Sequence, residues 1–208
     1  DRRKTKGTSL KFRAVDRWML SRINRLIKEN TKNYDEYNYF AVITSLQEFF
    51  WHEFCDFYLE EVKHRLYQSD KFGEESKQAA QFTLYVVLLD MVKMLAPIIP
   101  HTTEEIYDSI FKAHEGDKSL SQSKWPALYE QDIDEKAEKK AELLNSVLTE
   151  IRRFKGEKKM ALNAEIASVK IRTIEPELLD GVKEEIAEAG KAKAISSEQG
   201  DFKVEVVA

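Results

Sequence analysis

Basic side chains gather at two places in this 208-residue chain. Residues 1–28 hold ten Lys and Arg against two Asp, a balance of +8, whereas residues 29–208 have a balance of −12. Arg22 and Arg25 lie within a helical pattern, and a rigid helix that carries Arg on its outer face can bind phosphate. The second cluster consists of Arg152, Arg153, Lys155, Lys158 and Lys159. This distribution favours a nucleic-acid partner, although a net charge of −4 taken alone argues against one.

Aromatic residues follow the first basic segment and could bind the bases of such a partner. They are Tyr34, Tyr37, Tyr39 and Phe40. Bases splayed from a single-stranded RNA loop are held by aromatic stacking, worth ~1–3 kcal/mol per base, and by surrounding positive charge. Aromatic rings beside Arg side chains at one end of a bundle are therefore a candidate RNA-loop site, whereas most of the Phe side chains are expected to lie in the core.

Metal sites and catalytic nucleophiles need particular residue types at characteristic spacings. This sequence contains no complete set of such residues. A di-iron carboxylate bundle needs two Glu-x-x-His elements, and the chain has one, Glu61 with His64. His64 is therefore expected to be a solvated helix residue, and Cys55 a small buried core residue. No Ser-His-Asp arrangement, phosphate loop or glycine-rich nucleotide motif occurs. We expect no metal, cofactor or catalytic residue here; a metal-binding bundle is the alternative that predicts stoichiometric iron or zinc.

Composition sets the broad class of the protein. With 42% hydrophobic and 11% aromatic residues, the chain can bury a core, which excludes wholesale disorder. No apolar stretch approaches the ~20 residues of a membrane helix, so we expect no membrane partner. A single Cys excludes an intramolecular disulfide and is consistent with a reducing, cytoplasmic location.

The order of the predicted elements indicates a mainly α fold. Long helices are expected over residues 14–30, 37–67, 74–95 and 134–154, with a short one that follows Pro100 and ends near residue 111. After Gly156 the pattern changes to a strand at 164–173, a helix at 177–189 and strands at 191–196 and 201–207. We therefore predict an elongated helix bundle with a small C-terminal α+β appendage. The expected divisions are a flexible basic segment (1–13), the bundle (14–155) and the appendage (156–208).

Several motifs together resemble one family. They are DRWMLSRINRLI at 16–27, FFWHEFCDFYLEEVKHRLY at 49–67, MLAPIIPHTTEEIY at 94–107, Ser119-Leu120 with Trp125-Pro126, and IRRFKGEKKMALNAEI at 151–166. In this order they resemble the anticodon-binding domain of class Ia aminoacyl-tRNA synthetases over about residues 14–170. Ser121 stands where the family usually has His. The run from Trp51 to Glu60 is most similar to the valine-specific branch, and the leucine and isoleucine branches are the alternatives. The composition of residues 156–208 resembles an archaeal-type C-terminus.

The resemblance implies a function for the chain. It implies binding to the anticodon stem-loop of a tRNA, with base or phosphate contacts from the residues singled out above: Arg22, Arg25, Tyr37, Phe40, Arg152, Arg153, Lys158 and Lys159. The family's His-Ile-Gly-His and Lys-Met-Ser-Lys-Ser signatures are missing. We therefore expect a monomeric C-terminal part of a synthetase whose separate catalytic domain binds ATP, Mg and valine. A helical protein-interaction module is the rival interpretation, and it predicts no affinity for tRNA at moderate salt.

Overall fold

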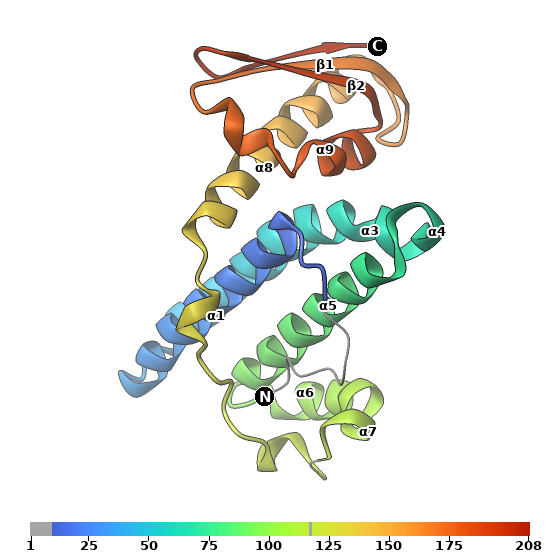
Figure 1. Cartoon of the computed structure of the whole chain (residues 1–208). Coiled ribbons are helices and arrows are strands. Elements are labelled where there is room, and N and C mark those ends of the chain that lie inside the picture. The colour runs from blue at the N-terminus through green and yellow to red at the C-terminus, as the bar shows by residue number, and fades with distance from the viewer. Residues whose placement is uncertain (1–9, 117) are drawn as a thin grey trace.

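The computed structural model describes residues 10–116 and 118–208 of the chain. It shows an elongated bundle of helices with a small sheet at one end (Figure 1), which confirms the predicted fold class. Most of the predicted flexible segment 1–13 lies outside the described residues. Its last residues contact the bundle, since the Phe12 ring meets the Phe82 ring edge-on with 5.7 Å between centroids.

Helical segments of very different length make up the bundle. They are α1 (Ala14–Asp35), α2 (Tyr39–Glu48), the π-helix η1 (Phe49–Tyr58), α3 (Leu59–Tyr67), α4 (Ser69–Phe72), α5 (Glu74–Leu95), α6 (Pro100–Ile106), the π-helix η2 (Tyr107–Phe111), α7 (Lys112–Glu115), the 3-10 turns η3 (Leu120–Gln122) and η4 (Glu130–Asp132), and α8 (Glu135–Glu157). The bounds of α5 are those predicted, because Gly73 precedes it and Pro97 follows it.

The long second helix is interrupted by wider turns that the sequence pattern did not predict. Residues 39–67 stay helical, but the ten residues of η1 form a π-helix between α2 and α3. Phe49, Phe54 and Tyr58 are buried there, at spacings of five and four residues. A helix with i→i+5 hydrogen bonds repeats over more residues than an α-helix, so the wide turns bring these three rings onto the core side.

The appendage is a three-stranded sheet covered on one face by helices. Its elements are β1 (Ile166–Thr173), the 3-10 turn η5 (Pro176–Leu179), α9 (Lys183–Gly190), β2 (Ala192–Gln199) and β3 (Lys203–Val207). The central strand β1 pairs with β2 in parallel and with β3 in antiparallel orientation. The C-terminal half of α8 and α9 lie under the sheet (Figure 1), where Ile166, Val169 and Ile171 are buried.

Helix α5 departs from the expectation that no segment is long and apolar enough to cross a membrane. By length and composition its 22 residues pass that test. Of the 18-residue window that passes, 56% is buried, and α5 packs beside α1 and α3 inside the bundle. Core helices of globular domains have the same composition, so α5 is assigned to the core.

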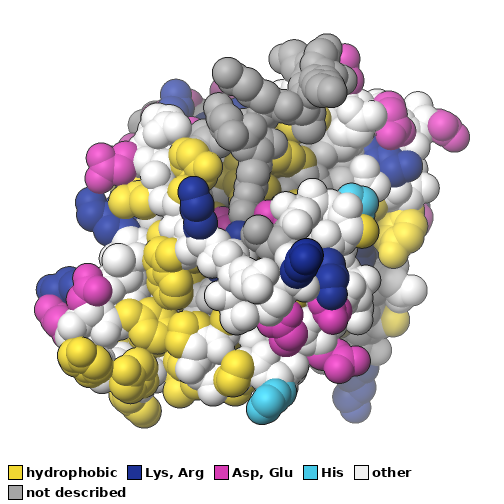
Figure 2. Space-filling view, turned by 90° about the horizontal axis from the view of Figure 1, so that it is seen from below, with side chains coloured by type: hydrophobic (Ala, Val, Ile, Leu, Met, Phe, Trp, Pro, Cys, Tyr) yellow, Lys and Arg dark blue, Asp and Glu magenta, His cyan; other side chains and the backbone are white. Residues whose placement is uncertain are grey.

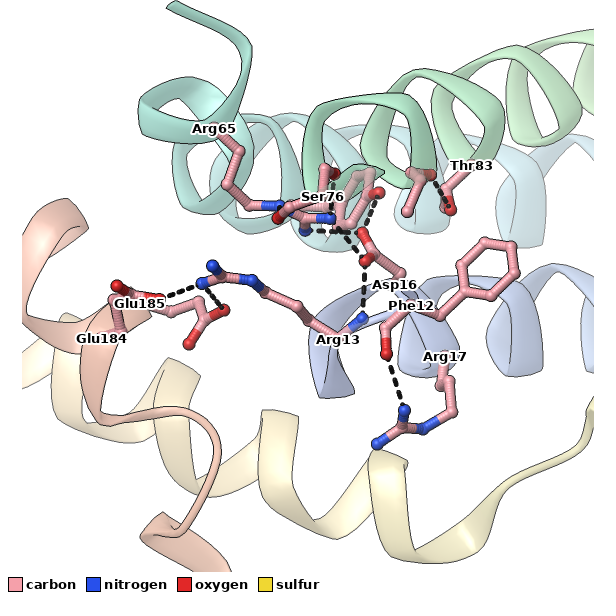
Figure 3. Close-up of polar contacts among 11 residues, drawn as sticks. Phe12, Arg13, Asp16, Arg17, Arg65, Ser76, Thr83, Glu184 and Glu185 are labelled. Carbon is pink, nitrogen blue, oxygen red and sulfur yellow. Dashed lines mark hydrogen bonds and ion pairs between the residues drawn. The ribbon is translucent and has the colours of Figure 1, made fainter. Parts of the chain in front are cut away.

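A buried ion pair joins three helices near the start of α1. The Arg65 guanidinium donates to both carboxylate oxygens of Asp16 at 2.8 Å, and both side chains are fully buried (Figure 3). Asp16 also accepts from the Tyr58 hydroxyl and from the backbone N–H of Arg13, each at 2.8 Å. Arg65 further donates to the side chain and the carbonyl of Ser76 on α5. The four hydrogen bonds to Asp16 compensate its desolvation.

Removal of one partner from this pair should strongly destabilise the fold. Arg65→Met leaves the Asp16 carboxylate buried without its counter-charge, a change that costs about 3–5 kcal/mol in comparable sites. Urea denaturation should show this loss in the free energy of unfolding. The double variant Asp16→Asn, Arg65→Met leaves neither charge of this pair, and it should regain part of the lost free energy of unfolding. A loss below about 1 kcal/mol in Arg65→Met would contradict the proposed importance of the pair.

Two further titratable groups are buried where the bundle meets the appendage. Burial, followed by the charge of Glu185, raises the pKa of Glu61 to about 8. Burial, followed by the charge of Arg13, lowers the pKa of His64 to about 4. His64 is 6% exposed, so the expectation of a solvated residue was wrong. Its ring lies edge-on to the Phe72 ring of α4, with 4.5 Å between the ring centroids. Helical periodicity within α3 does not reveal this contact with a neighbouring helix.

These two groups make stability depend on pH in opposite directions. Because the folded-state pKa of Glu61 is raised from 4.5 to about 8, its contribution is complete below 4.5 and is lost as pH rises to about 8. His64 contributes above pH 6.5, and this stability is lost as pH falls to about 4. Between pH 6.5 and 8 the free energy of unfolding should therefore fall by up to ~1.4 kcal/mol per pH unit. The variant Glu61→Gln should lack this slope and keep the acid-side loss; an unchanged slope would refute the assignment.

Candidate nucleic-acid interface

Arg22 and Arg25 lie on α1, and both are held by carboxylates. The Arg22 guanidinium donates to both oxygens of Glu53 on η1 at 2.7 Å, and Arg25 Nε donates to Glu138 on α8 at 2.7 Å. The hydrogen bonds that they donate to these carboxylates raise the pKa of both Arg side chains. The side chains are 36% and 38% exposed, so each guanidinium is reachable from solvent. An incoming phosphate would have to exchange with a carboxylate that is already in place.

Tyr37 and Phe40 form the exposed part of an aromatic tip at the turn between α1 and α2. Tyr37 is 77% exposed and has a left-handed backbone with φ of 58°, and Phe40 is 81% exposed. The Asn38 side chain accepts from the N–H of Ala41, which caps α2. Two large rings therefore stand in solvent on a capped turn, as the sequence predicted for a base-stacking surface.

The inner part of the aromatic tip, made by Tyr34, Tyr39 and Trp125, fixes the turn to the bundle. The Tyr34 hydroxyl donates to the Met94 carbonyl at 2.6 Å, and its ring lies edge-on to Tyr39 and Trp125 at 5.9 and 5.2 Å. Trp125 Nε1 donates to the hydroxyl of Thr31 on α1 at 2.9 Å. The sequence pattern placed Trp125 in a loop, and we did not predict it as part of the interface. The only available signal was the Trp-Pro pair.

An apolar groove of about 420 Å³ lies along α2 and η1. Ile43 and Trp51, at its edge, are 43% and 52% exposed. Its walls are completed by side chains of α5, α6 and η2, among them Leu88, Met91 and Ile110. Hydrophobic side chains also gather on the underside of the molecule (Figure 2), the side on which α6 and α7 lie.

The second basic group lies at the end of α8, next to the appendage. Arg152 donates to the carbonyl of Asp56 at 2.7 Å and lies 5.0 Å above the Phe57 ring. Arg153 is 66% exposed and forms ion pairs with Glu150 and Glu157. Lys158 is the C-cap residue of α8, and Lys159 follows it with a left-handed φ of 54°. Both lysines are exposed, and neither has a carboxylate within 4.0 Å among residues 10–116 and 118–208.

The structure brings part of the predicted set together and separates the rest. Glu53 and Asp56 are three residues apart on η1, so Arg22 and Arg152 both contact η1, at positions close together in the sequence. The aromatic tip lies further along α1, because the 12 residues from Arg22 to Tyr34 span roughly 18 Å of helix. The predicted residues therefore form a surface that runs from the tip along η1 to the end of α8.

Comparison with known proteins identifies the family of the chain. A family model described as "Anticodon-binding domain of tRNA ligase" matches residues 16–171. The chain belongs to this family. Valine–tRNA ligase of Pyrococcus abyssi is 42% identical over 170 residues, which are 82% of this chain and 19% of the relative. Those of Methanothermobacter thermautotrophicus and Pyrococcus furiosus are 40% and 37% identical, over 81% and 94% of the chain.

The chain spans about a fifth of the length of these relatives. The part matched by the anticodon-binding family includes the whole bundle from Asp16 onward and most of β1. Arg22, Arg25, Tyr37, Phe40, Arg152, Arg153, Lys158 and Lys159 all lie inside it. Within the described ranges, no group of three or more His, Cys, Asp or Glu side chains could hold a metal ion.

Proposed function

We propose that this anticodon-binding domain binds the anticodon stem-loop of a tRNA as part of a valine–tRNA ligase. The observation that carries the proposal is the aromatic tip: two rings that are 77% and 81% exposed, fixed at the end of the helix that holds Arg22 and Arg25. An anticodon loop presents unstacked bases and closely spaced phosphates, which such a surface matches. Valine is proposed over leucine or isoleucine because the relatives named above are valine–tRNA ligases.

Each part of the surface has its own role in the proposed complex. Tyr37 and Phe40 stack on splayed bases, while Arg22 and Arg25 exchange Glu53 and Glu138 for phosphate or base edges. The basic residues at the end of α8 hold backbone phosphates outside the loop. Each of these Arg side chains is already paired with a carboxylate. Binding of RNA therefore replaces one anion by another and leaves neither guanidinium without a counter-charge. The acidic remainder of the surface repels RNA that docks in other orientations.

The remaining assignments follow from this proposal. Ligation of valine with ATP and Mg belongs to a separate catalytic domain that this chain does not include, and no cofactor is assigned here. We place the protein in the cytoplasm and treat the chain as a monomer attached to that domain. The divisions at 13/14 and 155/156 remain our proposal; α8 itself continues through the second boundary to Glu157.

Substitutions in the tip and on α1 should weaken binding for different reasons. Phe40→Ala removes a stacking ring and should cost ~1–3 kcal/mol in affinity for tRNA, with little change in salt dependence. Arg22→Ala removes a phosphate contact and should also lower the slope of log K against log[salt] by about one. Filter binding of the 208-residue chain to valine tRNA, repeated at several salt concentrations, measures both quantities.

Matched controls are available elsewhere on the chain. Tyr67, at the end of α3, is an aromatic side chain that is 83% exposed, and Tyr67→Ala should leave affinity unchanged. Arg172 is paired with Glu198 and is 40% exposed, so Arg172→Ala controls for Arg22→Ala. Equal effects of target and control variants would contradict the site assignment. Absence of tRNA binding by the unaltered chain at moderate salt would favour a protein-interaction module instead.

A further inference from the structure

A second concave site lies where the bundle meets the appendage, and we call it the junction cleft. Its volume is about 360 Å³. Residues of η1, α3, α8, the loop after α8 and the end of α9 line it, among them Cys55, Lys155, Leu162 and Lys191. The close approach of α9 to α8 closes one end, since a Cβ on Gly190 would lie 2.9 Å from Ile151 Cδ1.

Lys155 places a buried positive charge in the wall of the junction cleft. The residue is 1% exposed, and its ammonium donates to the carbonyls of Leu162 and Gly190 at 2.8 and 2.9 Å. An ammonium has three N–H donors, so one remains. Among the described residues, no carboxylate lies within 4.0 Å of this nitrogen. A buried cation held by neutral carbonyls alone is unfavourable, and an anion in the cleft would compensate it.

Two more cations line the same space. Lys191 follows α9 with a left-handed φ of 57°, and its charge, after burial, is the second cause that lowers the pKa of Lys155. Arg152, three residues before Lys155 on α8, also lines the cleft and donates to the carbonyl of Asp56 on η1. The two carboxylates of the lining are engaged elsewhere, Asp56 with His52 at 3.3 Å and Glu60 with Lys63. The cleft therefore presents an excess of positive charge.

Apolar side chains supply the rest of the lining. Leu148 and Ile151 belong to α8, and Leu162 and Ala189 face them from the appendage. Asn163 adds an amide that can both donate and accept a hydrogen bond. An anion alone needs no apolar wall, and an apolar ligand needs no buried ammonium. A nucleotide, with its phosphate and flat base, meets both conditions.

We propose that the junction cleft takes up one nucleotide of the bound RNA, with its phosphate at Lys155 and Lys191 and its base against Leu148 and Leu162. This inference rests on the proposed binding of tRNA by the chain. Asp56, which lines the cleft, is three residues from the Glu53 partner of Arg22 on η1, and Arg153, Lys158 and Lys159 are within four residues of Lys155 in the sequence. The appendage would thus complete a nucleotide site that the bundle alone does not enclose.

Cys55 offers a direct test, because it lines the junction cleft and is the only cysteine of the chain. Its alkylation by N-ethylmaleimide, followed by mass spectrometry, reports access to the cleft. We expect a saturating anticodon stem-loop RNA to slow this alkylation at least several-fold. Fluorescence anisotropy of the labelled RNA must show binding under the same conditions.

A matched pair of variants tests the phosphate contact. Lys191→Asn removes the charge and keeps a residue that tolerates the left-handed backbone. It should weaken RNA binding several-fold and lower the salt slope by about one. Lys193→Asn, two residues away on β2, removes a lysine that is 67% exposed and paired with Glu165, and should leave both quantities unchanged.

The outcomes separate this inference from the proposed function. RNA that binds but leaves Cys55 alkylation unchanged, with equal affinities of the Lys191 and Lys193 variants, would overturn the junction cleft and leave the proposed function standing. Failure of the unaltered chain to bind RNA at all would overturn both. Protection of Cys55 together with the selective effect of Lys191→Asn is the result we expect.

Discussion

The carboxylate of Asp16 is the point from which the helices of the bundle are positioned. It accepts four hydrogen bonds, from the start of α1, from η1 and from the Arg65 guanidinium of α3, and through Arg65 it reaches Ser76 on α5. A buried pair of this kind is a weak source of net stability but a strong constraint on geometry, because any other arrangement leaves a charge unpaired. It fixes α1 relative to η1, and Arg22, Glu53 and Arg152 take their places from that arrangement.

The same charges explain how an acidic chain can present a surface for RNA. The Arg side chains of α1 are set against carboxylates of η1 and α8, so they are oriented and partly neutralised before any ligand arrives. Lys155, Lys158, Lys159 and Lys191 lack such partners in the described ranges, and they gather around the end of α8 and the junction cleft. Paired Arg side chains in one place and unpaired Lys side chains in another fit an anticodon-binding domain. Phosphates and unpaired bases need different contacts.

Local sequence rules predicted the elements well and the contacts between them less well. The ends of α5 follow from Gly73 and Pro97, and Phe40 is exposed near a helix start, while its stacking role stays a prediction. The wide turns of η1 were not predicted, because they arise from packing of rings against α1. His64 was placed in solvent and Cys55 in the core, whereas His64 is buried and Cys55 is half-buried in a cleft. The burial of His64 depends on the Phe72 ring of α4 and on the packing of α9 against α3, which helical periodicity cannot place.

The central claim is that the chain recognises the anticodon arm of a tRNA. The most direct test compares its affinity for two RNA hairpins made from one valine tRNA, the anticodon stem-loop and the acceptor arm, by fluorescence anisotropy at the same salt concentration. The account predicts that the anticodon stem-loop binds at least about tenfold more tightly, because its loop presents splayed bases and closely spaced phosphates together to the aromatic tip and the Arg side chains of α1. Equal affinities, or tighter binding of the acceptor arm, would contradict it.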